Sequence, residues 1–254
     1  MANDSRQVSR RMGFKMGVGL ASLLLALPTP ALAQTFSLDL GGATGTTERA
    51  LQLIALITIL SIAPAILIMV TSFTRIVVVL SLLRSAIGTQ SAPPNTVVVS
   101  LAIFLTGFIM APTAKEIYAN AVTPLVQGQI SADIAFERAS QPIRTFMLAH
   151  VREKDLELFL DMSGDPRPQT PELTPLTSLT PAFMISELRR AFEIGFLLFM
   201  PFLIIDLAVA SILMAVGMMM LPPTTVSLPF KLIFFVLVDG WSLVAGSLVK
   251  SYGL

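Results

Sequence analysis

The sequence predicts an all-α membrane protein in which two hairpin-like pairs of hydrophobic helical segments flank a helical domain outside the membrane. Of its 254 residues, 54% are hydrophobic and 13% are charged, and the mean hydropathy is +0.78. These values lie outside the range of soluble domains. Four apolar runs approach the roughly 20 residues that span a bilayer. Acidic residues concentrate between the second and the third run.

Residues 1–33 are typical of a cleavable signal peptide. A basic start leads into the apolar stretch GVGLASLLLAL, and the small-residue end ALAQ comes after it. We expect cleavage after Ala33, so the mature N-terminus lies outside the cytoplasm.

The four hydrophobic segments all depart from ideal lipid-facing helices. Pro64 and Pro201 interrupt the first and third runs, the second run is short, and the third and fourth contain acidic residues. We expect these segments at residues 51–70, 96–111, 191–221 and 232–249.

The first pair belongs to a region at residues 34–112, which begins with a Gly/Thr-rich lead. Its connector, residues 71–95, contains Arg75 and Arg84 and no acidic residue. Positive charge favours the cytoplasmic side, so both arginines are predicted to lie there.

Residues 113–180 are expected to form the exterior helical domain and a proline-rich linker. Residues 131–140, 142–151 and 152–164 are predicted to be short amphipathic helices, the last stopped by Gly164 in a left-handed conformation. Five prolines in residues 165–181 indicate an extended linker. Thr180 and Pro181 suit the start of the next helix, within the second hydrophobic pair at residues 181–254.

The composition excludes several classes of function. The chain has no cysteine and a single histidine, His150, so thiol nucleophiles and common metal motifs are ruled out. His150 continues a helical apolar stripe and is interpreted as structural. With a net charge of +1 and no basic run, we expect no nucleic-acid partner, and we expect no cofactor.

Asp206 and Asp239 are candidate functional residues, because an acid within an apolar segment needs a polar environment. We expect both to be buried and hydrogen-bonded. An intramembrane aspartyl protease is disfavoured, since Asp239 lies in LVDGW without the glycines that frame such acids. An ion or solute transporter stays open, because proline-broken segments with acids resemble transport helices, although no repeated halves are visible.

Three stretches carry a family resemblance: TSFTRIVVVLSLLRSAIGTQSAPPN at residues 71–95, PAFMISELRRAFEIGF at 181–196, and MPFLIIDLAVASILMAVGMMMLPPTTVSLPFKLIFFVLVDGW at 200–241. The sequence resembles the FliP family of flagellar biosynthetic proteins, which is related to the type III secretion export-gate proteins. The resemblance extends over nearly the whole mature chain.

The resemblance implies a non-enzymatic subunit that assembles with copies of itself, FliQ and FliR into the flagellar export gate. Unfolded flagellar proteins would pass through this gate in the bacterial inner membrane, and the exterior domain would be periplasmic. FlhA, FlhB and the basal-body membrane ring are further expected partners. An ion or solute channel and a static membrane scaffold are the alternatives.

The triplet Met218, Met219 and Met220 lies between the third apolar run and Pro222 and Pro223. Methionine side chains are flexible and apolar, so a ring of them can seal a pore and part for a passing chain. The two prolines are predicted to end the helix. The resemblance also implies a seal, since a methionine-rich loop forms the gasket in this family. The alternative is the plain apolar end of a membrane helix.

Glu187 and Lys231 are isolated charges that lie next to apolar segments. A charge in such surroundings needs a partner, so we predict that the two residues pair between neighbouring subunits. The alternative is that each is solvated at the surface.

Overall fold

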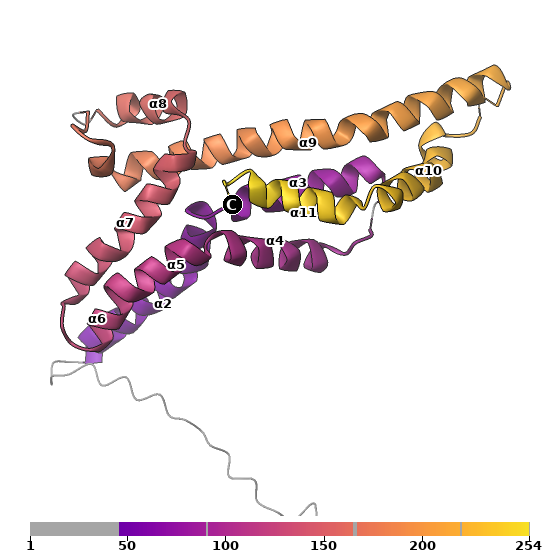
Figure 1. The fold of residues 1–254 in the computed structure, drawn as a ribbon. Helices are drawn as coiled ribbons and strands as arrows, with labels where there is room; N and C mark the ends of the chain where they lie inside the picture. The colour runs from indigo at the N-terminus through magenta and orange to yellow at the C-terminus, as the bar shows by residue number, and fades with distance from the viewer. Residues whose placement is uncertain (1–45, 90, 165–166, 219, 254) are drawn as a thin grey trace, which may run out of the picture. The chain divides into compact units, whose positions relative to one another are not determined.

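The computed structural model describes residues 46–89, 91–164, 167–218 and 220–253. The chain divides into two units, Met1–Ile54 and Ala55–Leu254, and every described helix after residue 69 lies in the second. Every regular element within the described ranges is helical, as predicted (Figure 1). The predicted signal peptide and its cleavage site at Ala33 lie outside the described residues.

The first apolar run forms α2 (Thr46–Met69). The helix continues through Pro64, and its apolar stretch Ala50–Met69 is long enough to cross a membrane. Among the described residues none of this stretch is buried, as is usual for a helix face that lipid or protein covers.

The predicted cytoplasmic connector contains a core helix, α3 (Phe73–Ile87). Eight of its residues are buried, and it packs against α9 (Leu176–Ala215) and α4 (Asn95–Ile109). The prediction of a simple connector therefore missed this helix. Its run IVVVLSLL is too short to span a bilayer, yet it is well suited to a protein core.

The predicted exterior domain consists of helices, as expected. The order is α5 (Ala111–Ile117), the π-helix η1 (Tyr118–Val122), α6 (Thr123–Val126), α7 (Ala132–His150) and α8 (Glu153–Ser163). The segments expected at 131–140 and 142–151 form one helix, α7, with Pro142 inside it. Gly164 ends α8 with a φ of 69°, so the predicted left-handed stop is confirmed.

Helix α9 is 40 residues long, which makes it the longest described helix. Its predicted start at Thr180 and Pro181 is wrong, because the helix begins at Leu176 and contains both Pro181 and Pro201. A proline removes one helical hydrogen bond, but α9 also packs along α3, α7, α8 and α10, and this packing keeps the helix continuous.

The fourth apolar run forms two helices rather than one. Helix α10 (Pro223–Leu237) and helix α11 (Gly240–Lys250) meet at a bend of 62°. Asp239 lies at this junction with a φ of 50°. The described part of the chain thus contains two helices long enough to cross a membrane, or four spans if the bent pairs α4 with α5–α6 and α10 with α11 each count as one.

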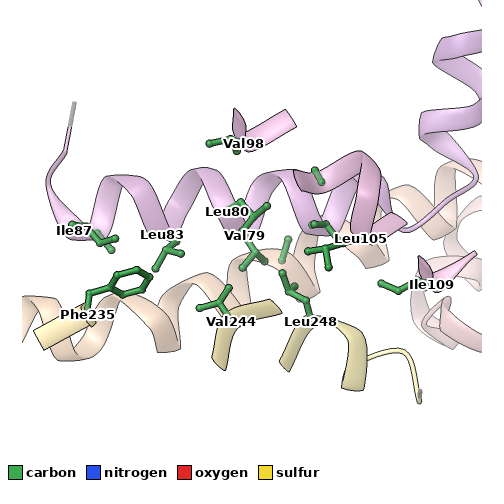
Figure 2. Packing of buried hydrophobic residues seen from close by; sticks show 14 of the residues in the cluster. Val79, Leu80, Leu83, Ile87, Val98, Leu105, Ile109, Phe235, Val244 and Leu248 are labelled. Atoms are coloured by element: carbon green, nitrogen blue, oxygen red, sulfur yellow. The ribbon is translucent and has the colours of Figure 1, made fainter. Parts of the chain in front are cut away.

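The main apolar core forms between α3, α4, α9, α10 and α11. Figure 2 shows Val79, Leu80 and Leu83 of α3 facing Phe235, Val244 and Leu248 from the C-terminal helices. Helices α3 and α9 approach closely at Gly195, where an added Cβ would lie 2.3 Å from Leu82 Cδ1. Glycine at this position lets the two helices come together.

Candidate functional site

A buried ion pair joins α3 to α9. Arg75 and Glu187 are both fully buried, and the guanidinium donates through Nε and Nη2 to the two carboxylate oxygens, with Nε at 2.8 Å from Oε2. Two parallel hydrogen bonds of this kind are the strongest arrangement for the pair. Arg75 is thus a buried structural residue of α3, and its placement on the cytoplasmic side stays a prediction.

The C-terminal residues complete this network. Arg75 Nη1 donates to Ser251 Oγ at 3.0 Å, and the guanidinium lies 3.9 Å from the centre of the Tyr252 ring. The Tyr252 hydroxyl donates to Glu187 Oε2. Burial and then the Glu187 carboxylate raise the pKa of Tyr252, so its hydroxyl remains protonated as the donor.

Tyr252 also connects the network to α7. Its ring stacks on Phe146 of α7 at 6.0 Å between centroids and lies 4.9 Å from the ring of His150. Phe146 in turn meets Phe183 of α9 edge to face. His150 thus packs among aromatic rings, and its Nδ1 lies 2.7 Å from the Phe146 carbonyl oxygen.

A second charge network lies further along α9. Lys231 of α10, 5% exposed, donates to Asp206 Oδ2 at 2.6 Å and to the Ala86 carbonyl oxygen at the end of α3 at 3.2 Å. Ser227 donates to the other oxygen of Asp206. The Asp206 side chain is 28% exposed and borders a cavity of about 600 Å³, so it is only partly buried.

The structure gives Glu187 and Lys231 different partners within the chain: Glu187 pairs with Arg75, and Lys231 pairs with Asp206. The need of each buried charge for a partner is therefore met without a second subunit. A contact between Glu187 and Lys231 of two chains stays a prediction, because a single chain does not test it.

Asp239 and Arg84 are placed differently from the buried networks. Asp239 is exposed, contrary to the prediction that it is buried, because it lies at the break between α10 and α11 rather than inside a helix. Arg84 is partly buried in α3, and its Nη1 lies 3.5 Å from the Pro93 carbonyl oxygen. Neither residue joins Arg75 in a common site.

The methionines come after the end of α9. Met218 is 46% exposed and Met220 is 98% exposed, while Met219 lies outside the described residues. Helix α9 ends at Ala215, and Gly217 has a φ of 81°. Pro222 caps α10 and Pro223 is its first residue, so the two prolines begin the next helix, which corrects the prediction that they end α9.

Sequence patterns did not identify Tyr252 and Gly217 as site residues, and they identified Arg75 as a basic residue without its partner Glu187. A glycine after the last residue of an apolar run is a known helix stop and would have identified Gly217. No local signal marks Arg75 or Tyr252, whose partner Glu187 lies 112 and 65 residues away in sequence. Over the described ranges, no group of three or more acidic or histidine side chains is placed to hold a metal ion.

Residues 56–248 match the FliP family. The chain belongs to the FliP family. It is therefore a non-enzymatic membrane component of the flagellar export gate, and the protease alternative is excluded.

Several FliP-family relatives are similar over most of their length. The flagellar biosynthetic protein FliP of Caulobacter vibrioides is 59% identical over 235 residues, which cover 92% of this chain and 88% of the relative. FliP of Bacillus subtilis is 55% identical over 201 residues, 79% of this chain and 91% of the relative. FliP of Pectobacterium carotovorum is 52% identical over 239 residues, 92% of each.

Proposed function

We propose that the chain is a subunit of the channel through which unfolded flagellar proteins cross the inner membrane, and that its methionine loop seals that channel. The loop is defined as residues 216–222, between α9 and α10. The observation that carries the proposal is the exposure of Met218 and Met220 in the loop between the 40-residue α9 and the apolar helix α10. A soluble monomer would have no reason to present flexible apolar side chains in this way.

The apolar surfaces support an assembly. Helix α9 exposes Phe192, Phe196, Leu197, Leu203, Ile204 and Leu207. Such faces need lipid or protein neighbours, and copies of this chain together with FliQ and FliR are the neighbours we propose. FlhA, FlhB and the basal-body ring would adjoin this assembly, with α5 to α8 on the periplasmic side.

Several copies arranged around one axis would bring their loops to one constriction. A narrow ring of thioether side chains excludes water and thereby blocks ions. Because methionine has several flexible torsions, the same ring can open around an unfolded chain and close after it. The driving force for export would come from other components, since the chain is not an enzyme.

Replacement of Met218, Met219 and Met220 by alanine tests the proposal. We expect the gate to assemble on native gels but to conduct ions in planar bilayers, whereas replacement by leucine keeps it closed and slows export. Met162→Ala is the matched control, since Met162 is 71% exposed on α8 and far from the loop in sequence. A triple-alanine gate as ion-tight as the parent would contradict the sealing role, and a parent that conducts at rest would favour an ion channel.

A further inference from the structure

The end of α9 has the hydrogen-bond pattern of a Schellman motif. The Met218 amide donates to the Leu213 carbonyl oxygen at 2.9 Å, and the Gly217 amide donates to the Met214 carbonyl oxygen at 3.1 Å. These are the two bonds that define this helix ending, with the left-handed residue at Gly217. The backbone of Met218 is therefore fixed to the last turn of α9.

This motif determines the direction in which the chain leaves α9. A helix that continued past residue 216 would carry the methionines along its axis, whereas a left-handed residue turns the chain away from it. Leu221 N then lies 3.5 Å from Met218 O, which closes a short turn before Pro222. The position of the exposed Met220 thus depends on one backbone conformation.

We propose that Gly217 is the positioning residue of the methionine loop: its left-handed backbone holds Met218 and Met220 in the orientation that closes the channel. This inference rests on the proposed sealing function. Gly217 has no side chain and contributes no surface to a seal, so its role is conformational. A residue with a Cβ disfavours the left-handed conformation. It would shift the equilibrium between this conformation and other conformations of the loop by about five- to thirtyfold.

The surroundings of Gly217 make the proposal testable. A Cβ added there would meet no atom within 4 Å, so an alanine introduces no clash within the chain. An effect of Gly217→Ala therefore reports the backbone conformation rather than lost packing. Asparagine tolerates the left-handed region better than alanine or valine, so Gly217→Asn is the conservative variant.

Gly128 offers a closely matched control. It lies just after α6 with a φ of 70°, an added Cβ there also meets no atom within 4 Å, and the flanking amides make the same two bonds. Gln129 N donates to Pro124 O at 2.9 Å and Gly128 N donates to Leu125 O at 3.0 Å. Gly128→Ala therefore disturbs the same motif in the exterior domain and leaves the methionine loop unchanged.

The experiment measures the ion conductance of gates purified with the tagged chain, in planar bilayers, after assembly is checked on native gels. We expect the leak to rise about five- to thirtyfold in Gly217→Ala and further in Gly217→Val. Gly217→Asn should leak less than Gly217→Ala, and Gly128→Ala should stay as tight as the parent.

Cysteine labelling provides a second readout if a variant assembles poorly. The chain has no cysteine, so Met220→Cys introduces a unique thiol. In intact cells we expect Met220→Cys with Gly217→Ala to react with a maleimide about five- to thirtyfold faster than Met220→Cys alone, because the loop leaves its sealed position.

The outcomes separate this inference from the proposed function. If the triple-alanine methionine variant leaks but Gly217→Val is tight and labels at the parental rate, the positioning role is wrong and the sealing role stands. Equal leaks from Gly217→Asn and Gly217→Val would also overturn the inference, since backbone preference would not be the cause. If the triple-alanine variant is as ion-tight as the parent, the proposed sealing function is wrong, and the positioning role of Gly217 that depends on it is wrong as well.

Discussion

The first half of α9 and the loop that comes after its last residue take part in opposite kinds of structure. In its first half, Glu187 is fully buried and bonded to Arg75 and Tyr252, which come from α3 and the C-terminus. At its C-terminal end, Met218 and Met220 are exposed, and the helix is closed by backbone bonds at Gly217. The first half of the helix is thus held by buried side chains, whereas the turn after its last residue is held by backbone bonds.

This difference indicates how a gate combines stability with movement. Charges buried with complete hydrogen bonding hold one arrangement, because any other arrangement leaves a charge without a partner. Exposed methionine side chains carry no charge that needs a partner, so they can change conformation at little cost in free energy. Substitutions in the charge network should therefore change stability, and substitutions in the loop should change conductance. Four substitutions test this contrast, in order of decreasing effect on stability.

The largest effect is expected for Glu187→Leu. This change leaves the Arg75 guanidinium buried without its carboxylate, which destabilises a protein by about 3–5 kcal/mol. The variant should melt at a lower temperature in mild detergent and fail to assemble on native gels. Combining it with Arg75→Met should restore part of the loss, because two apolar residues replace the pair.

Glu193→Leu is the control for this prediction. Glu193 lies on the same helix and pairs with Arg189, but the two side chains are 60% and 61% exposed. A surface pair contributes only about 0–1 kcal/mol. Equal melting temperatures for the Glu187 and Glu193 variants would show that the buried pair does not stabilise this end of α9.

A smaller loss is expected at Asp206, which pairs with Lys231 toward the loop end of α9. Asp206→Leu removes the carboxylate that pairs with the nearly buried Lys231. Because Asp206 is itself partly exposed, the expected loss in the free energy of unfolding is smaller than for Glu187→Leu, at about 2–3 kcal/mol. Asp206→Asn keeps a hydrogen-bond acceptor for Ser227 or Lys231 and should be milder. The melting temperature of the purified complex and the swimming motility of the cells are measured for both variants. Complete loss of motility in both, with assembly intact, would instead indicate a proton-relay role.

Tyr252→Phe should have a more modest effect. It removes the hydroxyl that donates to Glu187, while the ring still covers Arg75. We therefore expect the free energy of unfolding to fall by about 1–2 kcal/mol. The melting temperature of the purified complex measures it. Tyr118→Phe is the control, since Tyr118 is 65% exposed. Identical melting temperatures for both variants would show that the C-terminus does not contribute to the network.

Met220→Ala should have the smallest effect on stability. Its side chain is 98% exposed, so the change should lie within about 0.5 kcal/mol. If the loop seals the channel, the same variant should nevertheless raise ion conductance in planar bilayers. A clear drop in melting temperature without a leak would mean that Met220 packs in the assembly and does not seal it.

The helical class, the apolar segments, the helices between the second and third apolar runs, and the family could all be predicted from the amino-acid sequence. These features depend on composition, on the length of apolar runs and on local signals such as Gly164, all of which extend over a few neighbouring residues. The methionine triplet is local in the same sense. It is recognisable because no other stretch of the chain combines that composition with a double proline.

The pairing of the charges and the exact ends of the helices depend on the tertiary fold. Arg75 and Glu187 are 112 residues apart, and Lys231 lies 145 residues from the Ala86 carbonyl that it contacts, so no local pattern predicts either contact. The start of α9 at Leu176, ahead of Pro181, also depends on tertiary contacts. Local preference disfavours proline in a helix, but packing along α3, α7, α8 and α10 outweighs one missing hydrogen bond.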